Sequence, residues 1–221
     1  MAAEQIKSTS ITNLDATPIV PNTSAQGAAG RPAVVDDWAA CSGTPLQSTK
    51  SFYRLVRIPT GAIVKSLIIA TDKALDSGTP TLAFDINVAW SDSLTDGTPI
   101  AFQLATRGLA TTEAVIPTTA YDGSTMTTIS AYSAPNKLFG TVTPSSNSVA
   151  YLSGDLVFNG NNTNLAYTKI TSQPMWQYFG FVDGRGNPAD PGGYFDIIAY
   201  VVTAANVGVA GNLYCRCTYG L

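Results

Sequence analysis

The sequence predicts an all-β protein, an antiparallel β-sandwich that is jelly-roll-like. Short runs of β-branched and aromatic residues recur along the chain, and clusters of Gly, Pro, Asp and Ser separate them. No long segment shows the helical period of apolar residues. With 221 residues, the chain is long enough to bury a substantial core.

The predicted strands begin after residue 48 and are bounded by turn clusters such as DSGTP and NGNNTN. They are SFYRLVRI (51–58), AIVKSLIIA (62–70), TLAFDINVAW (81–90), AYLSGDLVF (150–158), YFDIIAYVV (194–202) and LYCRCTY (213–219). The first two flank a Pro-Thr-Gly turn, which predicts a hairpin. Weak helical signals occur only at 100–107 and 174–179.

Alternation within the runs predicts which strands are covered on both faces. Residues 81–90 place apolar side chains on one face and Asp85 and Asn87 on the other, which is typical of a half-solvated strand. Residues 194–202 are apolar on both sides of Asp196 and predict an inner strand. The carboxy-terminal third should contribute to the core through Trp176, Phe179, Tyr194, Ile198 and Tyr200.

The chain divides into an extended amino-terminal arm (1–45) and a β-sandwich domain (46–221) with an excursion at about 110–172. The arm has too few apolar residues to fold by itself, so it is either a loose tail or a segment that becomes ordered on a neighbouring subunit. In the second case Trp38 is its anchor, together with Val34 and Val35. Ile19 and Val20 are further apolar residues of the arm.

Composition excludes several classes of function. Only 12% of residues are charged and the net charge is −3, without any run of Lys or Arg, so a nucleic-acid partner is not expected. The amino terminus has no apolar signal region, and no apolar stretch is long enough to span a membrane. The surface must be covered largely by small polar residues, which is typical of proteins that pack against others.

The sequence contains no candidate catalytic site and no expected cofactor. Histidine is absent, and most acids lie in turns where backbone hydrogen bonding explains them, so we do not expect an enzyme. The loop 183–193 offers oxygen ligands from Asp183, Asn187 and Asp190, too few for a calcium loop, and no metal is expected. The three cysteines are expected to be buried reduced thiols: Cys41, Cys215 and Cys217.

Several segments resemble a family of tailed-bacteriophage virion proteins that act as capsid decoration, or cement, proteins. The segments that carry the resemblance are RIPTGA (57–62) with IVKSLIIATD, LAFDINVAW, DGTP, PMWQYFG, DPGGYFDI and TAANVGVAGNLYCRCTY. They cover roughly residues 52–107 and 174–219. These are core and turn patterns, so the resemblance implies a fold and a setting more than a mechanism.

The resemblance implies a protein made in the host cytoplasm that binds the outside of a capsid and stabilises its lattice. Its expected partners are the major capsid protein and further copies of itself, most simply as a trimer. Arg54, Arg57 and Lys65 then fix a subunit or capsid contact by pairing with acids, unless they only mark a solvent face. Arg54 is the most suggestive of the three, because alternation puts it on one strand face with Val56 and Ile58.

Two other functions remain open from the sequence. One is a carbohydrate-binding or fibre-tip module, with an aromatic platform made of Trp90, Trp176 and Tyr121. The other is a capsid subunit with a single jelly roll, which would assemble into closed shells alone. Fold class by itself does not separate these functions.

Overall fold

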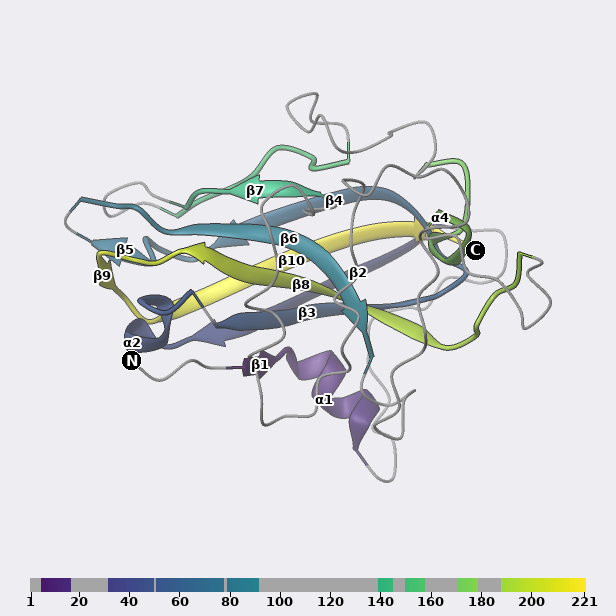
Figure 1. Cartoon of the computed structure of the whole chain (residues 1–221), viewed down its shortest axis with the longest axis horizontal. Coiled ribbons are helices and arrows are strands. Elements are labelled where there is room, and N and C mark those ends of the chain that lie inside the picture. Colours follow the sequence, from purple (N-terminus) through teal and green to yellow (C-terminus); the bar gives the residue numbers. More distant parts are fainter. Residues whose placement is uncertain are drawn as a thin grey trace.

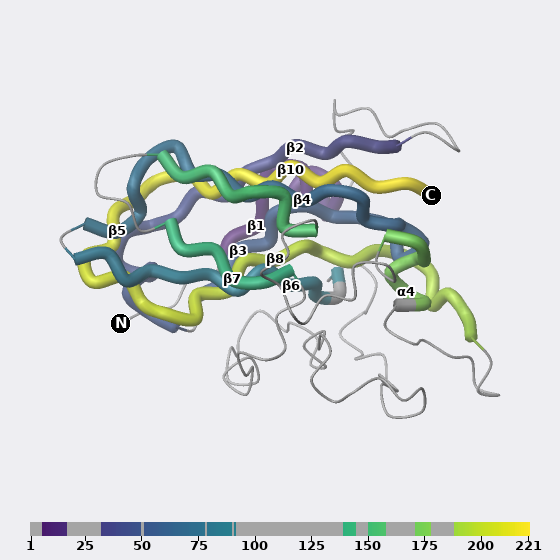
Figure 2. Tube along the Cα trace, turned by 90° about the horizontal axis from the view of Figure 1, so that it is seen from above, coloured from purple at the N-terminus to yellow at the C-terminus, as the bar shows by residue number. Residues whose placement is uncertain are grey.

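The computed structural model describes residues 5–16, 32–49, 51–77, 79–91, 139–144, 150–157, 171–178 and 188–221. Over these residues the chain forms two packed β-sheets, so the antiparallel β-sandwich predicted from the sequence is confirmed (Figure 1). Seen from above, β2, β10 and β4 form one layer, and β3, β8 and β6 lie in the other (Figure 2).

The larger sheet has five strands in the order β1-β3-β8-β6-β7. Its strands are β1 (Gln5–Lys7), β3 (Phe52–Pro59), β8 (Tyr194–Thr203), β6 (Ala83–Trp90) and β7 (Gly140–Val142). All neighbours are antiparallel except β1 and β3, which are parallel. β8 is the central strand and most of its residues are buried, which confirms the prediction of an inner strand.

The smaller sheet has three strands, β2 (Ala33–Cys41), β10 (Gly211–Gly220) and β4 (Ile63–Thr71), in the order β2-β10-β4. A third pairing joins β5 (Asp76–Ser77) to β9 (Val207–Gly208). The helices are short: α1 (Thr9–Asp15), α2 (Gly43–Leu46) and α4 (Met175–Tyr178). α4 falls where a weak helical signal was predicted, whereas residues 100–107 lie outside the described residues. No helix in the described part of the chain is long and apolar enough to cross a membrane.

The core lies between the two sheets. Tyr53 and Phe84 are fully buried there and meet edge-to-face, with ring centroids 5.9 Å apart. Burying a large apolar side chain of this kind stabilises the fold by about 1.5–3 kcal/mol. The three cysteines are buried and reduced, as predicted. Burial raises the pKa of Cys217 to about 12, so this thiol is not a reactive nucleophile.

Asp76 fastens the β5–β9 end of the sandwich. Its buried carboxylate accepts hydrogen bonds from the backbone N–H groups of Thr81, Leu82, Asn206 and Val207. Burial alone would raise the pKa of Asp76, but these four hydrogen bonds outweigh it and hold the pKa below its usual value. The carboxylate therefore satisfies four amides that no β-ladder pairs at this end.

The Pro-Thr-Gly turn is not a hairpin. β3 pairs with β1 and β8, whereas β4 pairs with β10, so the turn carries the chain from one sheet to the other. Pro59 ends β3 because it has no N–H for a ladder. The carbonyls of Thr60 and Ala62 instead accept hydrogen bonds from the backbone of α4. The predicted hairpin is therefore wrong, although both of its strands exist.

Residues 150–157 run beside β4 and exchange backbone hydrogen bonds with Leu67, Ile69 and Thr71, but their pairing is irregular and amounts to an isolated bridge, between Leu152 and Ala70, instead of the predicted strand. Side-chain oxygens replace ladder carbonyls there: Asp155 accepts from the N–H of Leu67, and the Ser153 hydroxyl accepts from the N–H of Ile69. Short polar side chains compete with regular pairing in this way. Of the predicted excursion, residues 110–138, 145–149 and 158–170 lie outside the described residues.

The outer face of the five-stranded sheet is covered rather than half-solvated, so the prediction for 81–90 is wrong. Asp85 and Asn87 are buried, and Asp85 accepts a hydrogen bond from the hydroxyl of Thr141. Ile198 and Tyr200 are buried on the same outer face, as predicted for core residues. Of the other predicted core residues, Trp176 is half-buried against the core, Tyr194 is exposed at the start of β8, and Phe179 lies outside the described residues.

Much of the predicted arm belongs to the sandwich of its own chain. Residues 33–41 are the edge strand β2, paired along its whole length with β10. β1 pairs with β3, and α1 follows it along the same sheet edge. The structure therefore places no boundary at residue 45, because backbone pairing continues on both sides of it. Residues 1–4 and 17–31, including Ile19 and Val20, lie outside the described residues.

Candidate contact surface

The six predicted contact residues fall into two groups. Val35, Arg54 and Arg57 are buried inside the chain, whereas Val34, Trp38 and Lys65 are exposed. β2 separates two of them by simple alternation, because Val35 faces the core and Val34 faces outward. A buried residue of a stable fold is not available to a second molecule, so only the exposed group can make contacts.

A β-bulge brings Arg54 and Arg57 to one face of the sheet. Two residues spaced three apart on a regular strand point to opposite faces. In β3, however, Arg54 lies opposite Ile198 and Val56 lies opposite Ile197, so Leu55 is an extra residue. Both arginines therefore reach the outer face. The expectation that Arg54 shares a face with Val56 and Ile58 is wrong for this reason.

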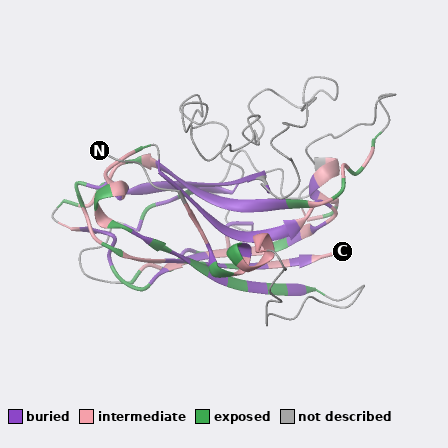
Figure 3. Ribbon diagram, turned by 90° about the horizontal axis from the view of Figure 1, so that it is seen from below, coloured by how far each residue is buried: buried purple, intermediate pink, exposed green. Residues whose placement is uncertain are grey.

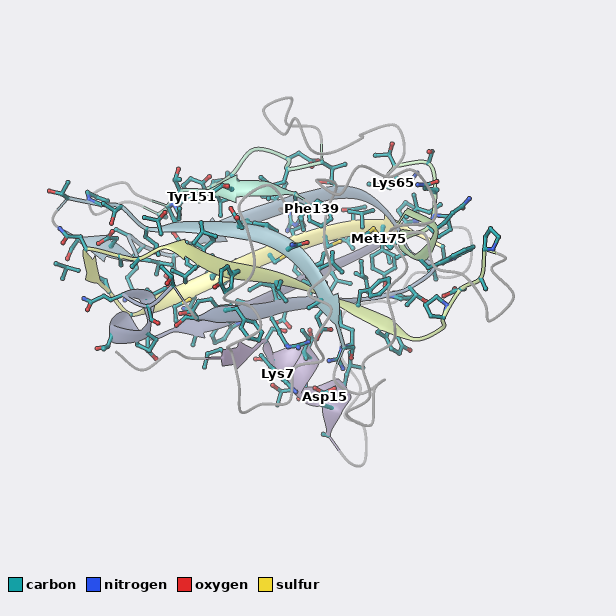
Figure 4. The ribbon with its side chains drawn as sticks, viewed as in Figure 1. Lys7, Asp15, Lys65, Phe139, Tyr151 and Met175 are labelled. Carbon is teal, nitrogen blue, oxygen red and sulfur yellow. The ribbon has the colours of Figure 1, made fainter. Side chains whose placement is uncertain are left out.

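The two guanidinium groups converge on one carboxylate. Arg54 Nη1 lies 2.6 Å from Asp196 Oδ2, and Arg57 Nε lies 2.7 Å from Asp196 Oδ1. Arg57 also pairs with Asp15 at the end of α1, and Asp15 in turn pairs with Lys7 at 2.9 Å. Lys7 and Asp15 lie side by side on the edge of the molecule (Figure 4).

Charge pairing dominates the electrostatics of this cluster. Burial alone would lower the pKa of Arg57, but the hydrogen bonds and charges of Asp196 and Asp15 outweigh it and raise the pKa. Burial would likewise raise the pKa of Asp15, but Arg57 and Lys7 hold it below its usual value. Arg54 and Arg57 thus pair with acids of the same chain, and this pairing leaves both guanidinium groups buried within it.

Lys65 is the remaining predicted cation. It lies in the irregular part of β4, and its ammonium group donates a hydrogen bond to the backbone carbonyl of Thr171. It lies far across the molecule from Lys7 and Asp15 (Figure 4). Lys65 is exposed and remains available for a contact, but it is remote from the buried arginines.

The described part of the chain presents its large exposed apolar side chains mainly on the outer face of the three-stranded sheet. There Trp38 of β2 lies opposite Tyr214 of β10, which lies opposite Ala70 of β4, and Leu152 bridges to Ala70. Trp38 is 41% exposed, Tyr214 37% and Leu152 72%. In Figure 3 the layer that contains β2 alternates between buried and exposed positions, whereas strands of the other layer are mainly buried.

The next row on this face carries charge. Asp36 of β2 lies opposite Arg216 of β10, and Ile68 of β4 completes the row. Arg216 Nε lies 2.7 Å from Asp36 Oδ1, and both side chains are more than half exposed. The pair leaves the surface locally neutral. We define the outer-face patch by the residues of these two rows: Asp36, Trp38, Ile68, Ala70, Leu152, Tyr214 and Arg216.

The outer-face patch is hollowed. A groove of about 600 Å³ runs between the tilted rings of Trp38 and Tyr214, whose centroids are 6.3 Å apart, and the side chain of Leu152. Ile68 and Ala70 form part of its lining. A mainly apolar groove whose Asp36–Arg216 pair is already neutralised favours packing against another molecule.

Other predicted sites are not assembled in the described residues. Asp190 accepts hydrogen bonds from the Thr60 hydroxyl and the Gly192 N–H, which identifies it as a turn residue, while Asp183 and Asn187 lie outside the described residues. No group of three His, Cys, Asp or Glu side chains comes together as a metal site in the described ranges.

The predicted aromatic platform is only partly covered by the structure. Trp176 packs against the core and so is not a freely presented ring. Tyr121 and the side chain of Trp90 lie outside what the structure describes. The exposed ring pair that the structure does show is Trp38 with Tyr214, and sequence alternation in LYCRCTY could have indicated the outward direction of Tyr214.

Comparison with known proteins gives a likeness of fold. No protein-family model matches the chain, and no curated protein matches its sequence. One solved chain, from a structure described as the capsid of Ralstonia phage GP4, is similar with a TM-score of 0.51 and 13% sequence identity. The similarity covers 98% of this chain and 97% of that chain. At this identity the likeness concerns the fold alone.

Proposed function

We propose that the protein is a structural component of a bacteriophage virion, and more specifically a decoration protein on the outside of the capsid. The observation that carries the proposal is the fold likeness to a chain of a phage capsid, which extends over nearly the whole of both chains. Partial likeness to a common β-sandwich would carry much less weight, because such sandwiches serve many functions.

Surface chemistry supports a role in assembly. The chain has few charges, and the outer-face patch combines exposed apolar side chains with an ion pair that is already neutralised. Burying such a surface requires little desolvation of unpaired charge. The proposed partners are the major capsid protein and further copies of this chain, and the proposal assigns the protein no catalytic activity.

A capsid subunit is the second candidate, and the same fold likeness favours it, since the similar chain comes from a capsid. The two functions differ in what the purified chain does alone. A subunit of the shell contains all the contacts needed to close it, whereas a decoration protein needs a lattice that others have built.

The deciding experiment mixes the purified protein with phage shells that lack it and sediments the mixture. Saturable binding with a fixed number of copies per shell, without shells forming from the protein alone, is the expected result. Closed shells assembled from this chain alone would identify the capsid subunit instead. Absence of both binding and assembly would refute a virion role. Light scattering on the unbound protein tests whether it is a trimer, as the resemblance implies.

A further inference from the structure

β2 shows an unusual distribution of side-chain size. Alternation turns five side chains toward the core, of which only Val35 is a large apolar one, while Val34 and the still larger Trp38 point to solvent. The inward set is Ala33, Val35, Asp37, Ala39 and Cys41. A surface strand normally buries its large apolar side chains and exposes its small or polar ones. The reversal in β2 indicates that its outward face is also a packing face, and that something outside the described fold covers it.

The row of apolar residues across this face is asymmetric in size. Two large rings, Trp38 and Tyr214, occupy β2 and β10, and the small Ala70 follows on β4, before Leu152. A surface with a large half beside a small half can complement itself, provided that a two-fold axis places the large half on the small half. Face-to-face packing requires that axis to lie between the sheets and parallel to them.

We propose that the outer-face patch binds the same patch of a second copy of this chain. The axis runs along the strands, above the space between β10 and β4. It places Tyr214 over the partner's Ala70 and Trp38 over the partner's Leu152, and the reverse contacts follow from symmetry. The inference rests on the proposed function for its setting, an oligomeric virion protein, but its geometry comes from the register of the sheet.

Charge pairing and the buried part of the patch both favour this two-fold axis over the alternative axis between β2 and β10. An axis between β2 and β10 would place Asp36 over the partner's Arg216, but it would leave Ile68, Ala70 and Leu152 uncovered. The axis between β10 and β4 covers the whole groove. Each Asp36–Arg216 pair then remains bonded within its own copy, with the apolar stem of Arg216 over the partner's Ile68, so no charge is left without a partner.

The size of the face sets the strength of the contact. Three strands about 4.8 Å apart and a β2 of nine residues at about 3.3 Å each give a footprint of roughly 400 Å² per copy. Stable complexes usually bury about 800 Å² per partner. We therefore expect a concentration-dependent dimer. If a trimer forms through other surfaces, the two-fold contact joins two trimers, because a trimer contact needs two different surfaces on each copy.

The test measures mass by sedimentation velocity of the purified full chain, from low micromolar to near-millimolar concentration, without shells. The wild-type protein is expected to double its mass as concentration rises. Ala70→Arg, which adds bulk and like charge beside the axis, should weaken association about tenfold or more. Val207→Arg is the matched control, since Val207 is an exposed apolar residue outside the patch, and it should associate like the wild type.

A size exchange tests the register itself. Tyr214→Ala alone and Ala70→Tyr alone should each weaken the dimer, because one leaves a gap and the other a clash. The double variant Ala70→Tyr/Tyr214→Ala restores large against small across the proposed axis and should recover association. Thermal unfolding at low concentration, where the chain does not associate, checks that every variant is folded.

Several results would overturn the inference. The first is a wild-type protein whose mass never doubles with concentration. The second is a Val207→Arg variant that weakens association as much as Ala70→Arg does. The third is a folded Ala70→Tyr/Tyr214→Ala variant that does not recover association. Shell binding is measured separately by co-sedimentation. A protein that never doubles its mass but loses shell binding on Ala70→Arg would show that the patch faces the shell, which refutes the dimer and keeps the decoration function. A protein that dimerises but does not bind shells would keep the dimer and refute the decoration function.

Discussion

The two sheets each carry an Arg–Asp pair on the outer face, with nearly the same geometry. Arg57 Nε lies 2.7 Å from Asp196 Oδ1 on the five-stranded sheet, and Arg216 Nε lies 2.7 Å from Asp36 Oδ1 on the three-stranded sheet. In both cases the partners lie directly opposite each other on neighbouring antiparallel strands. The side chains of the first pair are 2% and 0% exposed, those of the second 61% and 54%.

Since the two pairs share their geometry, we expect burial to decide how much each ion pair contributes to stability. Removing one partner of a buried pair leaves the other charged and without solvent, whereas an exposed pair returns to water at little cost. The buried cluster therefore holds the amino-terminal segment on the sheet, while the exposed pair sets the charge of a surface. The following predictions test that contrast, beginning with the largest effect.

Asp196→Ala should lower the free energy of unfolding by about 3–5 kcal/mol, because it leaves two buried guanidinium groups without their shared carboxylate. Denaturant titration measures the loss, and Asp36→Ala is the control that should leave the unfolding midpoint unchanged. If the two variants lose equal stability, burial is not what separates the pairs.

Arg57→Lys should cost roughly 2 kcal/mol, because an ammonium group cannot reproduce the bidentate contact with Asp196 and also reach Asp15. Arg216→Lys should unfold at the same temperature as the wild type. Calorimetry measures the unfolding temperature of both variants. If Arg57→Lys is as stable as the wild type, a single positive charge is enough to stabilise the buried cluster, and the bidentate contact is not needed.

Acid should release the amino-terminal segment through Asp15. Since its pKa is lowered in the folded state, Asp15 contributes stability that is present above its unfolded pKa, about 3.9, and is lost as pH falls through the lower folded pKa. Asp15→Asn should therefore show a shallower loss of stability below about pH 4. Thr9→Ala, an uncharged change on the same helix, should lose stability with falling pH as steeply as the wild type. If Asp15→Asn also loses stability as steeply as the wild type, Asp15 is not the group that titrates.

Trp38→Ala should have only a small effect on the unassociated chain, at most about 1 kcal/mol, because the ring lies partly in solvent on the outer face of its sheet. Phe52→Ala on the covered outer face is the contrasting variant and should cost about 3–5 kcal/mol. Thermal unfolding at low concentration compares them. A large loss in Trp38→Ala would show that Trp38 serves the fold and not a contact.

Runs and alternation of apolar residues predict strands well where the large apolar side chains point into the core. They located β3, β4, β6, β8 and β10 to within a few residues. They missed β2, because Val34 and Trp38 point outward and the inward residues are mostly small or polar, which hides the period. The same reversal that concealed the strand is what marks its outer face as a contact surface.

The buried cluster could not be predicted from spacing. Arg54 and Arg57 are three residues apart, so a regular strand would separate them, and the bulge at Leu55 that unites them leaves no mark in the sequence. Their partner Asp196 is about 140 residues away and Asp15 comes from the other end of the chain. The assignment of β3 and β4 to different sheets is equally non-local, because it depends on which later strands they pair with.

The position of the central strands has a consequence for synthesis on the ribosome. β8 lies in the middle of one sheet and β10 in the middle of the other, yet both come from residues 194–220. Until these residues emerge, no strand joins β3 to β6 or β2 to β4 by backbone pairing. A nascent chain would therefore expose the apolar faces of the earlier strands until residues 194–220 have emerged. The whole sandwich should then close in one late step, so interrupted chains should aggregate instead of leaving a folded fragment.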